Sequence, residues 1–271
     1  EISACLVGSE MCIRDRFVVS AKLPNAKMPE FIGVYNRIKQ GAKIYFRTPR
    51  LKALLALNLA IASASAVVIV NTVFLVQTTF ELTEQATTWA FGLFGLGSML
   101  AAFALPKILD KLNDRTVMLS GTVVLVVGLL SGYFISTYAW LLALWFILGI
   151  GYSVSQTPTG RLIRKSASSE NRAALFAAQF AFSHACWLIT YPLVGWLSTN
   201  FGTLITFVPM AFIALVSMVV AFVTWPRKDD LVLEHTHPDL PQDHEHLLQH
   251  NHKGKHEHEF MIDRYHQHWP K

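Results

Sequence analysis

The segment Gly160-Arg161-Leu162-Ile163-Arg164-Lys165-Ser166-Ala167-Ser168-Ser169-Glu170-Asn171-Arg172 decides the fold, because it separates two long apolar runs. The runs extend from Tyr138 to Pro158 and from Ala173 to Leu197. Each run is long enough to cross the hydrocarbon core of a bilayer as a helix, which takes about 20 apolar residues. The segment between them carries four basic residues, and such residues indicate which side of a membrane a connection occupies.

The composition of the whole chain points to the same class of protein. Of its 271 residues, 52% are hydrophobic and 15% are charged, whereas soluble globular proteins carry about 25% charged residues. The formal net charge of +5 comes from Lys and Arg in short connections between apolar runs. This distribution argues against a basic face for nucleic acid. The three cysteines predict no disulfide framework.

The N-terminal region divides into two parts. Residues 6–16 resemble one reading frame of a transposon-based sequencing-library adaptor, so we expect residues 1–16 to be an artefact that takes no part in the fold. Residues 17–52 have the character of the end of a preceding helix and a basic, partly amphipathic linker. Such a linker suits a helix on the anionic cytoplasmic face of a membrane.

Six apolar runs without Asp, Glu, Lys or Arg occupy the region from residue 53 to residue 226. The runs are Ala53–Gln77, Thr87–Leu105, Val117–Ser136, Tyr138–Pro158, Ala173–Leu197 and Leu204–Trp225. Every second connection is basic, so the positive-inside rule places these connections and both ends of the region in the cytoplasm. The sequence therefore predicts an all-α, multi-pass protein of the inner or plasma membrane with a six-helix transmembrane bundle. A soluble bundle of very apolar helices is the alternative.

Polar side chains within the runs indicate which helices avoid lipid, because such groups are costly against hydrocarbon. They predict that the first, fourth and fifth runs face a protein interior or a wet cavity, and that the third and sixth face lipid. His184, in the fifth run, suits either ion coupling or a hydrogen bond between helices. In the second run, Gly92, Gly95 and Gly97 permit close contact between helices. The candidates for contact with a substrate or coupling ion are Asn58, Asn71, Tyr152, Gln156, Gln179, His184, Trp187 and Tyr191.

A basic linker followed by six spans, the third and sixth the most apolar, resembles the C-terminal half of a major facilitator superfamily transporter. The segment Pro106–Arg115 resembles the family's G-x-x-x-D-R-x-G-R-R gating loop in its weaker second copy. The resemblance implies a missing N-terminal six-helix half of the same protein, with substrate bound between the halves near the midplane. It also implies that Asp110 pairs with Arg164 or Arg172 in one access state. The gating-loop candidates are Asp110, Lys111, Arg115, Arg164 and Arg172.

The tail, residues 227–271, contains ten of the eleven histidines, in five His-x-His pairs. Alternate residues of an extended segment point the same way, and neutral imidazole suits Ni, Co, Zn or Cu. Low apolar content predicts a disordered tail, in which residues 260–265 form either a short helix docked on the transporter or packing filler. A pH-sensing cluster and a solvated tail without a role are alternatives to metal binding. The candidate metal ligands are His235, His237, His244, His246, His250, His252, His256, His258, His266 and His268.

Three functions fit these features. The first is a secondary active transporter that exports a divalent transition metal such as nickel or cobalt, because similar tails occur in the superfamily's nickel- and cobalt-resistance efflux carriers. The second is a carrier of small organic molecules or drugs with a regulatory metal-binding tail, and the third is a membrane-tethered metal buffer or sensor. Enzyme motifs are missing from the sequence, so we predict neither catalysis nor a required cofactor. The expected partners are the lipid bilayer, a small-molecule or ion substrate and the missing half.

Overall fold

The computed structural model describes residues 34–168, 170–227, 232–235, 256–262, 266 and 269, and the side chains of residues 34–38, 233–235 and 256–259 are outside this description. The predicted leader, residues 1–16, and residues 17–33 of the linker therefore lie outside the described residues. Most of the tail lies outside them as well, including His237, His244, His246, His250, His252 and His268.

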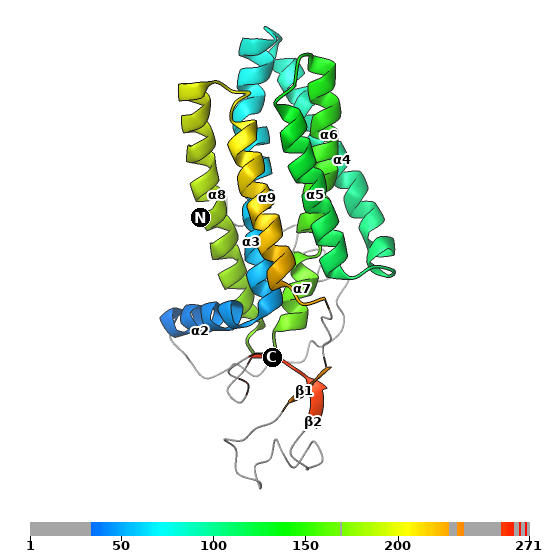
Figure 1. Ribbon diagram of the computed structural model, residues 1–271, viewed down its shortest axis with the longest axis vertical. Coiled ribbons are helices and arrows are strands. Elements are labelled where there is room, and N and C mark those ends of the chain that lie inside the picture. The colour runs from blue at the N-terminus through cyan, green and yellow to red at the C-terminus, as the bar shows by residue number, and fades with distance from the viewer. Residues whose placement is uncertain are drawn as a thin grey trace, which may run out of the picture. The chain divides into compact units, whose positions relative to one another are not determined.

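Long helices make up most of the described chain (Figure 1). The elements are α2 (Val34–Arg47), α3 (Pro49–Val73), the π-helix η1 (Phe74–Thr79), α4 (Glu84–Leu109), α5 (Asp114–Gly132), α6 (Tyr138–Gln156), α7 (Thr159–Ser166), α8 (Arg172–Phe201), α9 (Phe207–Thr224), β1 (Val232–His235) and β2 (His256–Glu259). Six segments are long and apolar enough to cross a membrane, namely Pro49–Thr79, Glu84–Leu109, Asp114–Gly132, Tyr138–Ser166, Arg172–Phe201 and Phe207–Thr224. The six predicted spans and the all-α bundle are confirmed.

Local sequence explains several helix ends. Pro49 begins α3, where its missing N–H would have no intrahelical partner. Thr137 caps α6, because its side-chain oxygen accepts a hydrogen bond from the backbone N–H of Trp140 at 3.3 Å. Gly202 follows α8 with a φ of 94°, a backbone conformation that favours glycine.

The helix α3 lies at the centre of the bundle, where it packs against α5, α6, α8 and α9. It is the most deeply buried span, and α4, which packs mainly on α6, is the least buried. Burial within this chain does not separate the third and sixth runs from the rest, since α8, the fifth run, is more exposed than both α5 and α9. Gln179, Ser183 and His184 of α8 line an open cavity.

Two glycines bring α4 and α6 into close contact. A Cβ atom on Gly97 would lie 2.1 Å from the carbonyl oxygen of Phe146, and one on Gly149 would lie 2.0 Å from that of Phe94. By contrast, Cβ atoms on Gly92 and Gly95 would meet no atom within 4 Å. Of the three glycines predicted to permit close contact, Gly97 alone does so in this chain.

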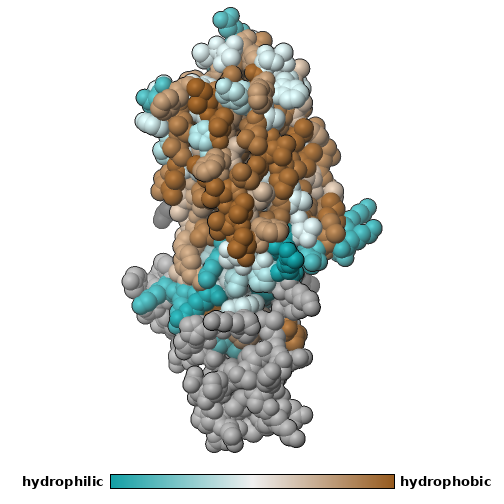
Figure 2. All heavy atoms as spheres, in the orientation of Figure 1, coloured by the Kyte–Doolittle hydropathy of each residue, from teal (hydrophilic) through white to brown (hydrophobic). Residues whose placement is uncertain are grey.

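On the face drawn in Figure 2, the bundle is hydrophobic along most of its length and more hydrophilic at its ends. Large side chains such as Trp89, Phe103 and Leu188 are more than half exposed, which suits contact with lipid and not with water. Every Lys and Arg with a described side chain lies in α2, α7, at helix ends or in connections on the side of the bundle where α3 and α8 begin. We call this side the basic end.

The basic end carries the helix α2 and part of the tail. Tyr45 and Ile44 of α2 are buried, and α2 packs against α8 and α3. Its predicted position on the membrane face stays a prediction. In the tail, β1 and β2 pair in antiparallel register with His235 opposite His256. Phe260 and Ile262 are buried in one apolar cluster with residues of α3 and α7. Parts of the tail therefore have ordered, packed structure where the composition predicted disorder.

Candidate functional site

A cavity of about 500 Å³ opens between α3, α6, α7 and α8 in the half of the bundle nearer the basic end. Its volume falls within the range of about 300–1,000 Å³ that is usual for small-molecule sites. Its lining contains one histidine and no Asp, Glu, Lys or Arg. The lining residues are Asn58, Ile61, Gln156, Thr159, Gly160, Ile163, Phe176, Gln179, Phe180, Ser183, His184 and Trp187.

Two polar atoms of the cavity wall lack partners. Asn58 and Thr159 are 3% and 7% exposed, and Asn58 Nδ2 and Thr159 Oγ1 have no hydrogen-bond partner in the described part of the chain. A buried donor without a partner costs about 1–3 kcal/mol, so such groups are uncommon unless a ligand or water completes them. Both atoms can donate to an acceptor that enters the cavity.

Gln179 on α8 is held in place from outside the cavity. Its Oε1 accepts a hydrogen bond of 2.5 Å from Tyr45 Oη on α2. Burial, with a smaller contribution from Cys186, raises the pKa of the Tyr45 phenol, so this group stays protonated and remains a donor. Because Gln179 Oε1 already accepts the hydrogen bond from Tyr45, its amide nitrogen Nε2 is the atom that can serve a ligand, as a third donor.

The aromatic side of the cavity is built on α8. The His184 ring lies 3.9 Å from the Phe180 ring and 5.2 Å from the Trp187 ring, measured between centroids. His184 Nδ1 lies 2.8 Å from the Phe180 carbonyl oxygen, which only accepts, so Nδ1 must carry a proton. In the neutral ring, Nε2 then holds the lone pair, which can take a proton, accept a hydrogen bond or bind a metal ion.

The structure brings together five of the eight predicted contact residues and separates the other three. Asn58, Gln156, Gln179, His184 and Trp187 line the cavity, and their contact with a substrate or coupling ion stays a prediction. The other three contact neighbouring helices or rings instead. Asn71 Nδ2 donates a hydrogen bond to Thr206 Oγ1 at 2.6 Å. The Tyr152 ring packs on that of Phe94 with 5.7 Å between centroids, and the Tyr191 ring stacks on that of Trp187 with 6.3 Å between centroids.

Sequence reasoning missed several residues of the cavity. Phe176, Phe180 and Ser183 line it, but such residues are common in membrane helices and carry no signal alone. The sequence did contain a signal for Thr159. Pro158 and Gly160 on either side of it indicate a break between two helices, and α6 ends and α7 begins there.

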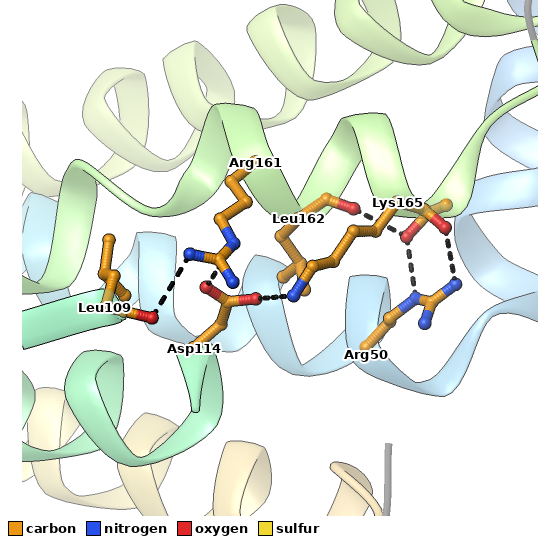
Figure 3. Close-up of polar contacts among 7 residues, drawn as sticks. Arg50, Leu109, Asp114, Arg161, Leu162 and Lys165 are labelled. Carbon is orange, nitrogen blue, oxygen red and sulfur yellow. Dashed lines mark hydrogen bonds and ion pairs between the residues drawn. The ribbon is translucent and has the colours of Figure 1, made fainter. Parts of the chain in front are cut away.

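An ion cluster joins α5 to α7 at the basic end (Figure 3). Asp114, the first residue of α5, is 5% exposed. It pairs with Arg161 Nε, which lies 3.4 Å from Asp114 Oδ1, and with Lys165 Nζ. Arg161 also donates to the carbonyl oxygen of Leu109 at 3.4 Å, so one guanidinium links both sides of the α4–α5 connection to α7.

The aspartate that forms these ion pairs, Asp114, lies four residues after Asp110, the aspartate that the gating-loop resemblance indicated. Asp110, Arg164 and Arg172 are exposed, and the ion pairs found among the described residues are those of Asp114. Arg115 bonds to the carbonyl oxygens of Trp225 and Phe222 at the end of α9 instead. Asp114 occupies the N-terminus of a helix, where a carboxylate also interacts favourably with the helix dipole.

Among the side chains that the structure describes, no group of three or more His, Cys, Asp or Glu is placed to hold a metal ion. His235, His256 and His258 are described by their backbone alone. His266 is described fully and is 4% exposed against the ring of Phe260. Metal binding by the tail therefore stays a prediction.

Comparison with known proteins agrees with the six-span bundle. The family model of the Major Facilitator Superfamily matches residues 53–251. A search of curated proteins found no match. The matched region covers most of the chain and includes the cavity residues and the ion cluster. The chain therefore belongs to the major facilitator superfamily of membrane transporters, and its six spans make it a multi-pass membrane protein.

Proposed function

We propose that this chain forms one half of a secondary active transporter for a small organic molecule, with a metal-binding tail that regulates it. The observation that carries the proposal is the pair of buried donors, Asn58 Nδ2 and Thr159 Oγ1, that lack partners on the wall of one cavity. Their chemistry suits a cargo with hydrogen-bond acceptors, such as a carbonyl, ether or heteroaromatic nitrogen.

The remaining walls favour an organic cargo over a bare ion. Phe176, Phe180 and Trp187 supply aromatic faces, and uncharged amides supply directed polar contacts. A first-row metal ion binds preferentially to several imidazole, thiolate or carboxylate groups, and His184 is the one such side chain on this wall. An aromatic molecule with acceptors suits the wall better.

The positive-inside rule places the basic end on the cytoplasmic side of the membrane. The cavity would then open in the cytoplasmic half of the membrane. The missing N-terminal half would supply the opposite wall and, since the six spans have few ionisable groups, most of the proton-coupling groups. We assign the Asp114–Arg161–Lys165 cluster as the contact that holds α5 and α7 together at this end in the access state of this structure. Asp110, Lys111, Arg115, Arg164 and Arg172 remain candidates for the other states.

Efflux of a divalent transition metal such as nickel or cobalt is the second candidate. It is favoured by the ten histidines in five His-x-His pairs, a density of imidazoles that suits collection of an ion near the pore. In that case His184 Nε2 would be the contact that this half offers to the ion. A membrane-tethered metal buffer would bind the ion without transporting it.

Transport by the full-length protein distinguishes these functions. We would measure efflux of the aromatic dye Hoechst 33342, together with cellular nickel and cobalt, in cells that express wild type, Asn58→Leu or Thr159→Val. We expect both substitutions to reduce dye efflux and to leave metal content unchanged. Gln77→Leu, a polar position outside the cavity, serves as the control. If metal content rises in the cavity variants and dye efflux is unaffected, metal export replaces our proposal.

A further inference from the structure

A C-terminal segment is packed onto the basic end of the bundle. Phe260, Ile262 and His266 are 3%, 4% and 4% exposed. The Phe260 ring lies edge-on to the ring of His266, with 4.8 Å between centroids, and to that of Trp269, with 5.2 Å between centroids. We call Phe260, Ile262, His266 and Trp269 the latch residues.

Trp269 connects the latch residues to a buried arginine of α3. The guanidinium carbon of Arg50 lies 5.3 Å from the centroid of the Trp269 ring, within the distance of a cation–π contact. Arg50 is 1% exposed, so the aromatic ring contributes to shielding this cation from water. Such a contact is stronger when the cation is desolvated.

Arg50 in turn holds the end of α7. Its Nε donates to Ser166 Oγ at 2.8 Å, and its Nη2 donates to the carbonyl oxygen of Lys165 at 2.9 Å. Lys165 also pairs with Asp114 on α5. Contacts therefore connect Trp269 through Arg50 to the ion cluster at the basic end. Figure 3 shows the part from Arg50 to Asp114.

The latch residues also pack near the substrate cavity. Phe260 and Ile262 belong to one buried apolar cluster with Leu54 of α3 and Ile163 of α7. Ile163 lines the cavity as well. One buried apolar cluster therefore includes two latch residues and a side chain of the cavity wall.

We propose that the latch residues hold the basic ends of α3 and α7 together, and that a transition-metal ion that takes His266 as a ligand releases them. This release rests on the metal binding that we propose for the tail. The occupant of the surface is the chain's own C-terminal segment, and the releasing ligand is a cation such as Zn²⁺ or Ni²⁺ that prefers imidazole.

Burial of His266 is the reason that metal binding and docking compete. A zinc ion is usually bound by four ligands, and a ring that is 4% exposed against Phe260 leaves little room for an ion and further ligands. Coordination by His266 therefore favours the undocked segment. A ligand that binds one of two conformations more tightly shifts the population toward it.

Distances between spin labels test this inference on the whole chain. Labels on Lys52→Cys of α3 and Met261→Cys beside the latch residues report docking, in a background without Cys5, Cys12 and Cys186. We expect a narrow, short distance distribution without metal. Saturating Zn²⁺ should lower the ratio of docked to undocked molecules about tenfold, a usual size for coupling between two ligands.

Two variants separate ligation from packing. His266→Phe keeps an aromatic ring against Phe260 but provides no ligand, so it should stay docked in Zn²⁺. Trp269→Ala should undock without metal and broaden the distances between labels on Lys52→Cys and Arg164→Cys, which report the α3–α7 contact. His235→Ala, outside the latch residues, is the matched control and should keep docking in the absence of metal.

Calorimetry on the same samples separates the two proposals. If Zn²⁺ binds and the distances do not change, release of the latch residues is refuted and the metal-binding tail stands. If Zn²⁺ does not bind, the metal-binding tail is refuted and release with it. If Trp269→Ala leaves both distance distributions unchanged, docking does not hold α3 and α7 together, whatever the metal does.

Discussion

The contact between α4 and α6 depends on Gly97, and replacing this residue by alanine tests the packing directly. The new Cβ atom would lie 2.1 Å from the carbonyl oxygen of Phe146 and 3.3 Å from the backbone nitrogen of Ile150. Van der Waals contact needs roughly 1 Å more than the shorter distance. Because backbone atoms form the obstacle, the two helices must separate, and overpacking of this kind costs about 1–3 kcal/mol.

Gly95→Ala on the same helix is the matched control. A Cβ atom on Gly95 would meet no atom within 4 Å, so this change should add up to about 1 kcal/mol through helix propensity. The Gly97 variant has the same propensity gain, and we therefore expect it to be less stable than the Gly95 variant by about 2 kcal/mol. Unfolding of the purified chain in mixed micelles with increasing SDS, followed by circular dichroism, measures the difference. Equal stability of the two variants would refute the α4–α6 packing.

Three further predictions concern single side chains. Asp114→Asn should lower the free energy of unfolding by about 1–2 kcal/mol in the same SDS assay, since it leaves two partly exposed cations without a carboxylate; no change would mean that the cluster contributes nothing. Asn58→Leu should raise the stability of the ligand-free chain by about 1 kcal/mol, because it removes a buried donor that has no partner, and a loss of stability would contradict this. Tyr45→Phe should lose about 1 kcal/mol. Burial raises the pKa of Tyr45 above that of the unfolded chain, so its advantage over the Phe variant should be full below about pH 10 and decline at higher pH; parallel pH profiles would contradict the assignment.

The spans were predictable because each physical requirement is local. The length of an apolar run predicts a span, and the number of basic residues in each connection predicts its side of the membrane. Both can be read directly from the sequence. The observed span from Arg172 to Phe201 includes the predicted run from Ala173 to Leu197. The observed ends extend further because polar residues continue a helix beyond the hydrocarbon core without penalty.

The cavity residues were only partly predictable. A polar residue in a membrane helix can either form a hydrogen bond to another helix or line a cavity, and the sequence does not distinguish these roles. Asn58 and Asn71 lie on the same helix and look alike in the sequence. The structure gives Asn71 Nδ2 a partner, Thr206 Oγ1 at the start of α9, whereas Asn58 Nδ2 has no partner among the described residues. Which use applies depends on residues more than one hundred positions away, and no local pattern contains that information.

The ion cluster shows a similar limit. Asp110 and Asp114 both flank the short connection between α4 and α5, and motif resemblance favoured Asp110. The choice is made by the start of α5, which buries Asp114 and directs it toward α7. The tail shows the same limit: the sequence left docking of residues 260–265 and packing filler as alternatives, and low average hydrophobicity could not indicate that Phe260 and Ile262 are buried.

Labelling of single cysteines from outside intact cells tests the orientation of the bundle most directly. Glu84 and Arg164 are exposed at opposite ends of the bundle. In a background without native cysteines, we expect a membrane-impermeant maleimide to label Glu84→Cys in intact cells and Arg164→Cys only after permeabilisation. Labelling of both positions, or of Arg164→Cys alone, in intact cells would contradict the cytoplasmic position of the basic end and of the tail beside it.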